Sequence, residues 1–377
     1  MKDMTIGFDA KRIVRNGTGL GSYGRTLVNS LVAENQNVQW RLYAPDAGRD
    51  DLRSQVISTP RLSFVYPSRA FFKFQKALWR SHGIVKDLKR DGVNIYHGLT
   101  GELPKGLRQA GIRSVVTIHD LIFMRHPEYY HWLDAKIYVH KFHAALKEAD
   151  RIIAISECTK RDILSFGHFP ENRIDVIYQS CSMRFRQRAD DTANEAVRRL
   201  YALPQRYILN VGTIEERKNI LLAVKALLQL PNDVSLVIVG RPTSYADKVK
   251  LFVQAHQLCT RVKFLHRIPD AHLPSIYQQA ECFVYPSRYE GFGIPVIEAL
   301  QSGLPVVACT GSCLEEAGGP DCLYVHPDDV EGMASALRQR LRGAEGREKS
   351  IVMSREYIRR FETANVAKQV MQVYRRL

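Results

Sequence analysis

The sequence predicts an α/β protein with two parallel-sheet domains, and three observations support that prediction. The chain has 377 residues, more than a single hydrophobic core usually organises. Its composition, 45% hydrophobic and 25% charged, is that of an ordinary globular protein. Short apolar runs alternate with helical segments through both halves of the chain. Because strand and helix alternate, we expect parallel sheets with right-handed crossovers and ligands at the carboxyl ends of the strands.

The predicted elements follow this alternation in order along the chain. The first half has five predicted strands, at 5–9, 38–43, 94–97, 114–119 and 151–156. The second half repeats the pattern at 207–212, 234–240, 262–265, 282–286 and 306–309. Predicted helices between them include 23–33, 220–230 and 273–280. The pattern is interrupted between residues 180 and 201, so we expect one domain over 1–185 and a second over 200–353.

The segment YPSRYEGFGIPVIEALQSGLPVVA, residues 285–308, is the most informative part of the chain. It places two carboxylates, Glu290 and Glu298, on either side of a Gly-Phe-Gly turn. A buried strand is predicted before the turn and a helix over 295–301 after it, with Pro in the first turn and Gly303 beyond its end. Amides at a helix N-terminus attract anions, and glycines let a ligand approach the backbone. Two acids beside an anion site indicate a ligand that is anionic and rich in hydroxyls, such as a nucleotide-sugar.

With this segment, the chain resembles the retaining glycosyltransferases of family 4, whose signature is two glutamates separated by seven residues in an EGFG-type turn. The resemblance extends to VGTIEERKNI at 211–220 and NGTGLGSYG at 16–24, and it covers nearly the whole chain. It implies the GT-B fold, in which two Rossmann-like domains face each other across a cleft. The first domain would bind the acceptor and the second the nucleotide-sugar. A C-terminal helix over 354–377 would cross back to the first domain.

The resemblance assigns the leaving diphosphate to Arg217 and Lys218, which follow a predicted strand. Arginine offers a bidentate fork and lysine a mobile point charge, so the pair suits a diphosphate. Two cations near the start of a helix are otherwise disfavoured by the helix dipole, and we expect Asn219 to cap that helix. The chain departs from the commonest family pattern because Thr213 stands where many members have an arginine.

The two glutamates take different roles in the resemblance. Glu298, expected in the first turn of its helix, would accept hydrogen bonds from the ribose hydroxyls of the donor. Glu290 would hold hydroxyls of the transferred sugar without acting as a nucleophile, because retention would follow attack on the face that the phosphate leaves. The backbone of the turn completes the expected donor site, through Gly291, Phe292, Gly293 and Ile294.

A glycine-rich loop in the first domain is expected to close over the donor phosphates or the acceptor. Its expected contact residues are Gly17, Thr18, Gly19 and Gly21. The segment 19–24 also satisfies the dinucleotide fingerprint G-x-G-x-x-G, but nine residues separate it from the preceding strand, whereas a Rossmann turn follows its strand directly.

Three further contacts are implied by the resemblance. His119, at the end of a predicted strand, would contact the donor sugar near its sixth carbon and belong to the catalytic set with Glu290, Arg217 and Lys218. Asp120 would touch the acceptor. Arg267 and Ile268 would pack on the nucleotide base.

We expect no metal and no cofactor beyond the nucleotide-sugar co-substrate. The Asp pairs at 50–51, 190–191 and 328–329 fall in expected loops, and the two cations at 217–218 supply positive charge. The chain contains seven cysteines without paired CxxC spacing, which is typical of a reducing cytoplasm. No apolar run reaches the roughly 20 residues of a membrane span, and no secretory signal is expected.

The net charge of +15 is concentrated in residues 61–90, which carry eight basic residues and Asp87 as the sole acid. Cations at 69, 73, 76 and 80 recur at helical spacing beside aromatic residues, which suits an anionic membrane surface. A surface helix with its apolar side in the core explains residues 69–80 equally well. We therefore expect a cytoplasmic protein, peripheral on the inner face of the cell membrane.

The function expected from these features is retaining, metal-independent transfer of a hexosyl unit to a lipid-linked glycan in bacterial polysaccharide synthesis. The expected unit is a mannosyl or related deoxyhexosyl group, with a GDP-sugar as its donor. Two rivals remain: a nicotinamide-dependent oxidoreductase using the glycines at 19–24, and a non-catalytic protein that binds nucleic acid or lipid through charge.

Overall fold

A computed structural model describes residues 4–67 and 73–377. The chain divides into two compact units. Unit 1 comprises Met1–Ser180 together with Phe361–Leu377, and unit 2 comprises Cys181–Arg360. The boundary after Ser180 falls where the predicted alternation of strand and helix is interrupted.

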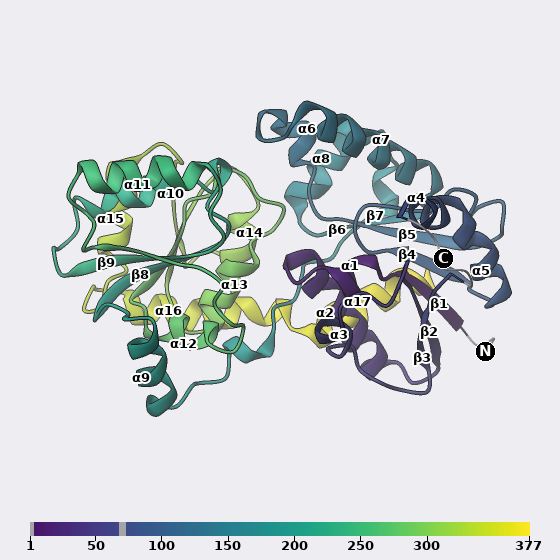
Figure 1. The fold of residues 1–377 in the computed structure, drawn as a ribbon, viewed down its shortest axis with the longest axis horizontal. Coiled ribbons are helices and arrows are strands. Elements are labelled where there is room, and N and C mark those ends of the chain that lie inside the picture. The colour runs from purple at the N-terminus through teal and green to yellow at the C-terminus, as the bar shows by residue number, and fades with distance from the viewer. Residues whose placement is uncertain (1–3, 68–72) are drawn as a thin grey trace. The chain divides into compact units, whose positions relative to one another are not determined.

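Unit 1 is built on a seven-stranded parallel sheet in the order β3-β2-β1-β4-β5-β6-β7 (Figure 1). Its strands are β1 (Met4–Asp9), β2 (Val38–Tyr43), β3 (Leu62–Val65), β4 (Ile95–Gly98), β5 (Arg113–Ile118), β6 (Arg151–Ala154) and β7 (Ile174–Val176). Its helices are α1 (Lys11–Arg15), α2 (Gly19–Glu34), α3 (Asp50–Arg53), α4 (Lys73–Leu78), α5 (Ile84–Arg90), α6 (Ile122–Arg125), α7 (Trp132–Glu148), α8 (Glu157–Gly167) and α17 (Thr363–Arg375). A π-helical segment, η1 (Trp79–Gly83), joins α4 to α5.

Both faces of this sheet are buried. Ile6 and Phe8 pack on one face in a core shared with α1, α2 and α17. Tyr43 and Tyr96 pack on the opposite face with Trp79 of η1. Burial on both faces explains why the strands read as continuous apolar runs.

Unit 2 contains a six-stranded parallel sheet in the order β10-β9-β8-β11-β12-β13. Its strands are β8 (Arg206–Val211), β9 (Val234–Val239), β10 (Val262–Leu265), β11 (Cys282–Tyr285), β12 (Val306–Cys309) and β13 (Leu323–Val325). Its α-helices are α9 (Asp191–Leu200), α10 (Ile220–Leu227), α11 (Tyr245–Ala255), α12 (Leu273–Gln279), α13 (Ile294–Gln301), α14 (Leu314–Gly318), α15 (Val330–Arg338) and α16 (Arg347–Tyr357).

The ten predicted strands all exist, within one or two residues at each end. The three strands that the sequence did not predict are β3, β7 and β13, and each lies at an edge of its sheet. An edge strand has a single neighbour and is less deeply buried, so its sequence needs no continuous apolar run. All four residues of β3 are indeed half-buried, as are all three of β13.

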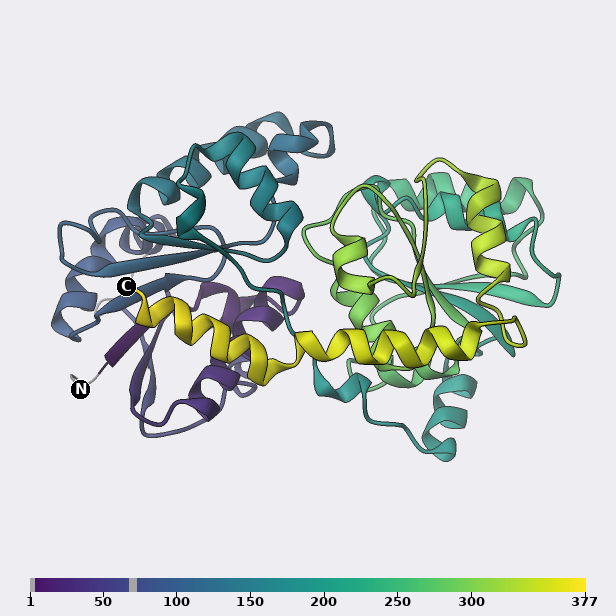
Figure 2. The same ribbon diagram turned by 180° about the vertical axis from the view of Figure 1, so that it is seen from behind.

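The prediction of one helix over 354–377 is wrong in detail. Helix α16 ends at Tyr357, a 3₁₀ turn covers Ile358–Phe361, and Glu362 is extended before α17 begins (Figure 2). Helix α17 packs against α2 in unit 1, where Val370 and Tyr374 are fully or almost fully buried. The chain thus returns to unit 1 through a break between two helices.

The predicted glycine loop at 17–21 is also wrong in part. Residues 11–15 form α1, and Gly19 already begins α2, so the loop is reduced to residues 16–18. A Cβ atom at Gly21 would collide with the carbonyl oxygen of Asn16. This glycine therefore allows α1 and α2 to approach each other closely, which is a packing role.

Candidate active site

Two loops of unit 2 meet because β8 and β11 are neighbouring parallel strands. The loop after β8 carries Arg217 and Lys218 in a 3₁₀ turn, Glu216–Lys218. The loop after β11 carries Glu290. The carboxyl ends of parallel strands meet at one edge of the sheet, so residues 72 positions apart in the chain come into contact.

Arg217, Lys218 and Glu290 form a compact ion cluster. Lys218 Nζ lies 2.5 Å from Glu290 Oε1, and Arg217 Nη1 lies 2.9 Å from Glu290 Oε2. The guanidinium also binds Glu215 through Nη2 at 2.7 Å, and Lys218 also donates to the Tyr285 hydroxyl at 2.6 Å. The side chains of the three cluster residues are each 15% exposed or less. Each carboxylate oxygen of Glu290 thus has its own cation.

This pairing controls the ionisation of the cluster. Burial alone would raise the pKa of Glu290, but Lys218 and Arg217 lower that pKa to about 2. Burial likewise opposes the charge on Lys218, yet Glu290 raises the pKa of the lysine above its ordinary value. Glu290, Lys218 and Arg217 therefore all stay ionised throughout the physiological pH range.

A cysteine thiol holds the Gly-Phe-Gly turn in place. The Cys313 thiol donates to the carbonyl oxygens of Glu290 and Phe292, at 3.1 and 2.6 Å. Gly293 has a φ of 136°, a conformation that disfavours any residue with a side chain. Ile294 begins α13 directly after it, with Pro295 in the first turn as predicted. The turn is consequently fixed at the N-terminus of a helix.

Glu298 lies apart from this cluster. It is the fifth residue of α13, so the expectation that it falls in the first turn is wrong, because the helix begins at Ile294. Tyr277 of α12 donates its hydroxyl to Glu298 Oε2 at 2.9 Å. Burial raises the pKa of Glu298 to about 7, against the lowering effect of the Tyr277 hydrogen bond. Glu290 and Glu298 therefore differ widely in pKa although they belong to one short segment.

In unit 2 the expected helix cap at Asn219 is wrong, whereas the base contact of Arg267 and Ile268 stays a prediction. Asn219 has a φ of 52°, and its side chain donates to the Pro327 carbonyl oxygen at 2.8 Å rather than capping α10. Arg267 is exposed, with a φ of 55°, in the loop after β10, and Ile268 is half-buried beside it. Strand β9 separates β10 from β8, so Arg267 follows a strand two places away from the one that leads to Lys218.

In unit 1, His119 follows β5 and uses both of its ring nitrogens. Nε2 lies 2.8 Å from the Leu99 carbonyl oxygen, which can only accept, so Nε2 carries the proton. Nδ1 then accepts from the Gln179 side-chain amide at 2.7 Å. Burial lowers the pKa of His119 to about 4, so the ring is neutral. A sugar contact through a ring nitrogen would require one of these two bonds to be exchanged.

His119 and Asp120 line a cavity of about 220 Å³ within unit 1. Arg12 of α1 and Leu20 of α2 also line it. Asp120 Oδ1 accepts from the Ile122 amide at 3.2 Å. The cavity therefore brings His119 and Asp120 beside α1 and the first turn of α2.

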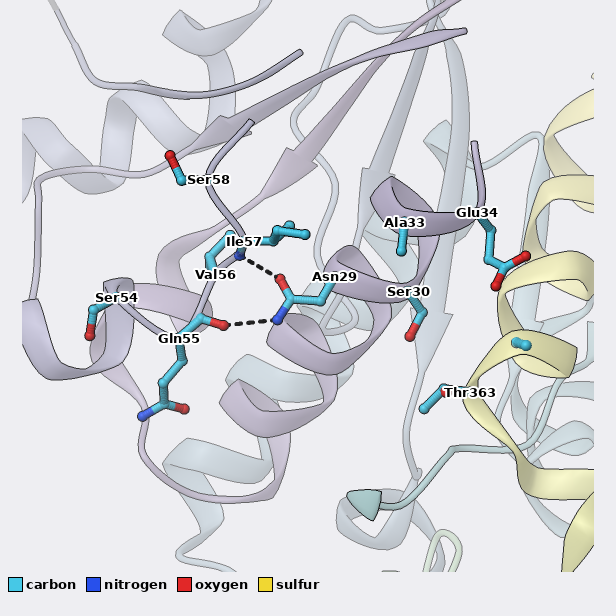
Figure 3. Close-up of a pocket in the computed structure, with 11 residues that line it drawn as sticks. Asn29, Ser30, Ala33, Glu34, Ser54, Gln55, Val56, Ile57, Ser58 and Thr363 are labelled. Atoms are coloured by element: carbon cyan, nitrogen blue, oxygen red, sulfur yellow. Dashed lines mark hydrogen bonds between the residues drawn. The ribbon is translucent and has the colours of Figure 1, made fainter. Parts of the chain in front are cut away.

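A different hollow, of about 640 Å³, lies against the opposite end of α2 and is lined by polar groups already in use (Figure 3). Asn29 donates to the Gln55 carbonyl oxygen at 2.8 Å and accepts from the Ile57 amide at 2.9 Å. Both ends of this amide therefore hold the segment 55–57 in place. We assign the hollow no part in the site.

Four site residues escaped the sequence reasoning: Tyr285, Tyr277, Cys313 and Gln179. Tyr285 is the last residue of β11, so the rule that ligands collect at strand ends could have found it. The other three act on Glu298, on the turn and on His119 through tertiary contacts that leave no local signal. Among residues 4–67 and 73–377, no three histidine, cysteine, aspartate or glutamate side chains gather as a metal site would require. Within the same residues, no helix has both the length and the apolar character needed to cross a membrane.

The chain is similar to known proteins over its full length. Its relatives include O-antigen chain mannosyltransferase B of Escherichia coli, 29% identical over 99% of this chain and 100% of that protein. They also include O-antigen chain mannosyltransferase RfbU of Salmonella typhimurium, 28% identical over 68% of each. Among solved structures, Anabaena HepE in complex with UDP and glucose has a TM-score of 0.76 at 17% identity, over 99% of this chain and 100% of that one. This likeness confirms the predicted GT-B fold class.

Two family models match the two halves of the chain in turn. The model described as Glycosyltransferase Family 4 matches residues 17–181, and the model described as Glycosyl transferases group 1 matches residues 194–356. Their division agrees with the division into units at Ser180. The chain thus consists of a glycosyltransferase family 4 domain followed by a glycosyltransferase group 1 domain.

Proposed function

We propose that this protein transfers a mannosyl or related deoxyhexosyl unit from a GDP-sugar to a lipid-linked glycan in bacterial polysaccharide synthesis. The transfer would retain the configuration of the sugar and would need no metal and no other cofactor. The observation that carries the proposal is the convergence of Arg217 and Lys218 on Glu290, beside the fixed turn that begins α13.

The donor site follows from this convergence. The Lys218 ammonium and the Arg217 guanidinium would turn from Glu290 to the two phosphates, and the amides of 291–294 would add donors. Preorganised donors at developing charge usually contribute more to catalysis than any other effect, and each is worth about 3 kcal/mol. Glu290, freed from its cations, would accept hydrogen bonds from hydroxyls of the sugar, and Glu298 would accept those from the ribose.

The reaction would proceed on one face of the sugar. The bond between the anomeric carbon and the diphosphate oxygen breaks as the acceptor oxygen forms the new bond on that same face. The acceptor proton passes to the departing phosphate oxygen, so charge and atoms balance. Glu290 acts on sugar hydroxyls and forms no covalent bond, whereas double displacement would need a carboxylate on the opposite face.

The choice of sugar rests on the relatives. O-antigen chain mannosyltransferase B and RfbU are named for mannosyl transfer to O-antigen, and the first aligns with this chain from end to end. A growing O-antigen chain is a lipid-linked glycan, which fits the proposed acceptor and a cytoplasmic enzyme at the inner membrane face.

The structure favours a different membrane-binding surface from the predicted segment 69–80. Part of the segment 69–80 lies outside the described residues. Of the rest, Lys76 pairs with Asp46 at 2.6 Å, and Arg80 is 14% exposed and pairs with Asp9, so neither is a free surface cation. Trp132 of α7 is 59% exposed, with the Lys136 ammonium 4.9 Å from its ring centre. An exposed aromatic beside a lysine suits a membrane interface, so α7 supports peripheral binding better.

A thermal-shift panel tests the donor. GDP, UDP, ADP and dTDP, each with its sugar conjugate, are added to the protein, and we expect the largest rise in melting temperature with the GDP pair. Transfer of labelled mannose to a glycan acceptor, with the anomeric configuration read by NMR, then tests the reaction. Glu290→Ala should nearly abolish transfer, whereas Arg199→Ala, on the exposed surface of α9, should leave it unchanged. Normal transfer by Glu290→Ala would refute the role of this carboxylate.

The oxidoreductase rival meets an obstacle in α2, because the glycines at 19–24 lie inside that helix. Tight NADH binding would nevertheless favour that rival. Strong, salt-sensitive DNA binding without nucleotide affinity would favour the charge-driven binding protein.

A further inference from the structure

A second cavity in unit 1 adjoins the His119 cavity and has no assigned role. Its volume is about 430 Å³, within the range of small-molecule sites. It shares Glu102 and Lys141 with the His119 cavity, so these two side chains form the wall between the two spaces. Its other walls come from η1, from the end of β1 and from α7.

The wall is held in place by ion pairs and backbone bonds. Lys141 Nζ lies 2.9 Å from Glu102 Oε1. Arg80 binds Glu102 at 3.1 Å and Asp9, which is 5% exposed, at 2.6 Å. The loop that carries Glu102 is bonded to β5 through the Gly101 amide, 2.9 Å from the Thr117 carbonyl oxygen. The charged groups are therefore fixed in position before any ligand arrives.

Tyr96 supplies a hydroxyl that this network leaves unused. The residue is 2% exposed and lines the cavity. In the described part of the chain its hydroxyl makes no hydrogen bond, although its ring packs on Tyr43, with ring centres 6.4 Å apart. The Tyr43 hydroxyl, in contrast, donates to Asp91 at 2.8 Å. A hydroxyl at a cavity wall that has no partner among the described residues can bond to a ligand.

The mixture of charges selects the kind of ligand. Two carboxylates offer acceptors and four cations offer donors around one space, namely Asp9 and Glu102 against Lys11, Arg80, Lys105 and Lys141. An anion would meet the two carboxylates, and an apolar ligand would make no hydrogen bond to any of the charged groups. A hydroxyl both donates and accepts, so a ligand with many hydroxyls satisfies both kinds of group. The aliphatic side chains of Leu78 and Leu103 complete the lining and suit the C–H face of a sugar ring.

We propose that this cavity is a second saccharide subsite, which binds a sugar of the acceptor glycan remote from the hydroxyl that reacts. The inference rests on the proposed function and on the prediction that Asp120, which lines the His119 cavity, contacts the acceptor. Glu102 and Lys141 border both spaces, so the cavities are adjacent and one oligosaccharide could reach across this border into both. Longer acceptors therefore bind more tightly than a single sugar.

Binding of mannose and of fluorescently labelled mannotetraose tests the subsite without any transfer reaction. The tetrasaccharide is followed by fluorescence anisotropy, and mannose by its competition with the label. Wild-type protein should bind the tetrasaccharide at least about tenfold more tightly than mannose. Tyr96→Phe should weaken tetrasaccharide binding about threefold to tenfold, the value of one hydrogen bond. Tyr43→Phe is the matched control, because it removes a neighbouring hydroxyl that faces Asp91, and it should leave binding unchanged.

The subsite is refuted if wild-type protein shows no saturable tetrasaccharide binding, or if Tyr96→Phe binds like wild type. It is also refuted if Tyr43→Phe weakens binding as much as Tyr96→Phe, because the loss would then reflect packing. The GDP-mannose thermal shift, a property of unit 2, is measured on the same variants and should not change. If GDP-mannose gives no thermal shift in the wild type but glycan binding still depends on Tyr96, the proposed function is refuted and the subsite is not.

Discussion

The raised pKa of Glu298 predicts that nucleoside binding strengthens with pH. Ribose hydroxyls donate hydrogen bonds, so they favour the ionised carboxylate over the protonated one. With a pKa of about 7, roughly a tenth of the carboxyl is ionised at pH 6 and roughly nine tenths at pH 8. If guanosine binds the ionised form alone, its affinity should rise about tenfold, or about 1.4 kcal/mol, between these two values.

Isothermal titration with guanosine at constant ionic strength measures this effect. Guanosine carries no phosphate, so titration of the ligand's own phosphate cannot imitate the pH dependence. Glu298→Gln is the control, because its side chain has the same size and does not ionise, and its affinity should be flat from pH 6 to 8. An affinity that is flat in the wild type, or that rises equally in the glutamine variant, would refute the ribose role of Glu298.

The same carboxyl predicts the pH dependence of stability. Its folded-state pKa lies above the unfolded value of about 4.5, so its contribution to stability is full below that value and is lost as pH rises through about 7. The melting temperature of the free protein should therefore fall more between pH 5 and 8 in the wild type than in Glu298→Gln. Parallel curves would contradict the raised pKa.

Other parts of the structure give further predictions. The double variant Arg217→Ala with Lys218→Ala should weaken GDP binding at least about a hundredfold and guanosine binding less than about threefold, because charge-assisted bonds to phosphate are lost. Calorimetry measures both affinities, and equal losses for the two ligands would refute the phosphate role. Gly21→Ala should lower the unfolding free energy by about 1–3 kcal/mol because α1 and α2 must separate, whereas Gly19→Ala, where a Cβ meets open space, should cost nothing; denaturant unfolding compares the two. Trp132→Ser should reduce sedimentation with anionic vesicles, and unchanged sedimentation would remove α7 from the membrane surface.

Much of the fold could be predicted because its signals are local. Central strands of a parallel sheet are buried on both faces, so β1 and β11 each read as an apolar run. The edge strands β3 and β13 are largely apolar too, but they are only four and three residues long, so the signal of each is short. The short helix α1 was missed for a related reason, since only Ile13 and Val14 of its five residues are buried.

The candidate site likewise has one part that is predictable from the sequence and another part that is not. The segment from Glu290 to Glu298 was recognisable because its residues are close in sequence and the chemistry of each is evident from its type. Contacts between distant residues were not predictable. Sequence alone placed Arg80 on a surface, whereas the fold directs it to Asp9, 71 positions earlier. The protonation of His119 likewise depends on Leu99 and Gln179, which no pattern around residue 119 reveals.

The pairing of Glu290 with Lys218 and Arg217 has a consequence for selectivity. In the proposed function, Arg217 and Lys218 carry a resident counter-ion, so a lone inorganic phosphate would gain these cations only by leaving Glu290 buried without a partner, at a cost of several kcal/mol. A sugar diphosphate would avoid that cost, because its hydroxyls would hydrogen-bond to Glu290 while its phosphates take the cations. The site would then bind a sugar diphosphate more tightly than a phosphate ligand that lacks the sugar.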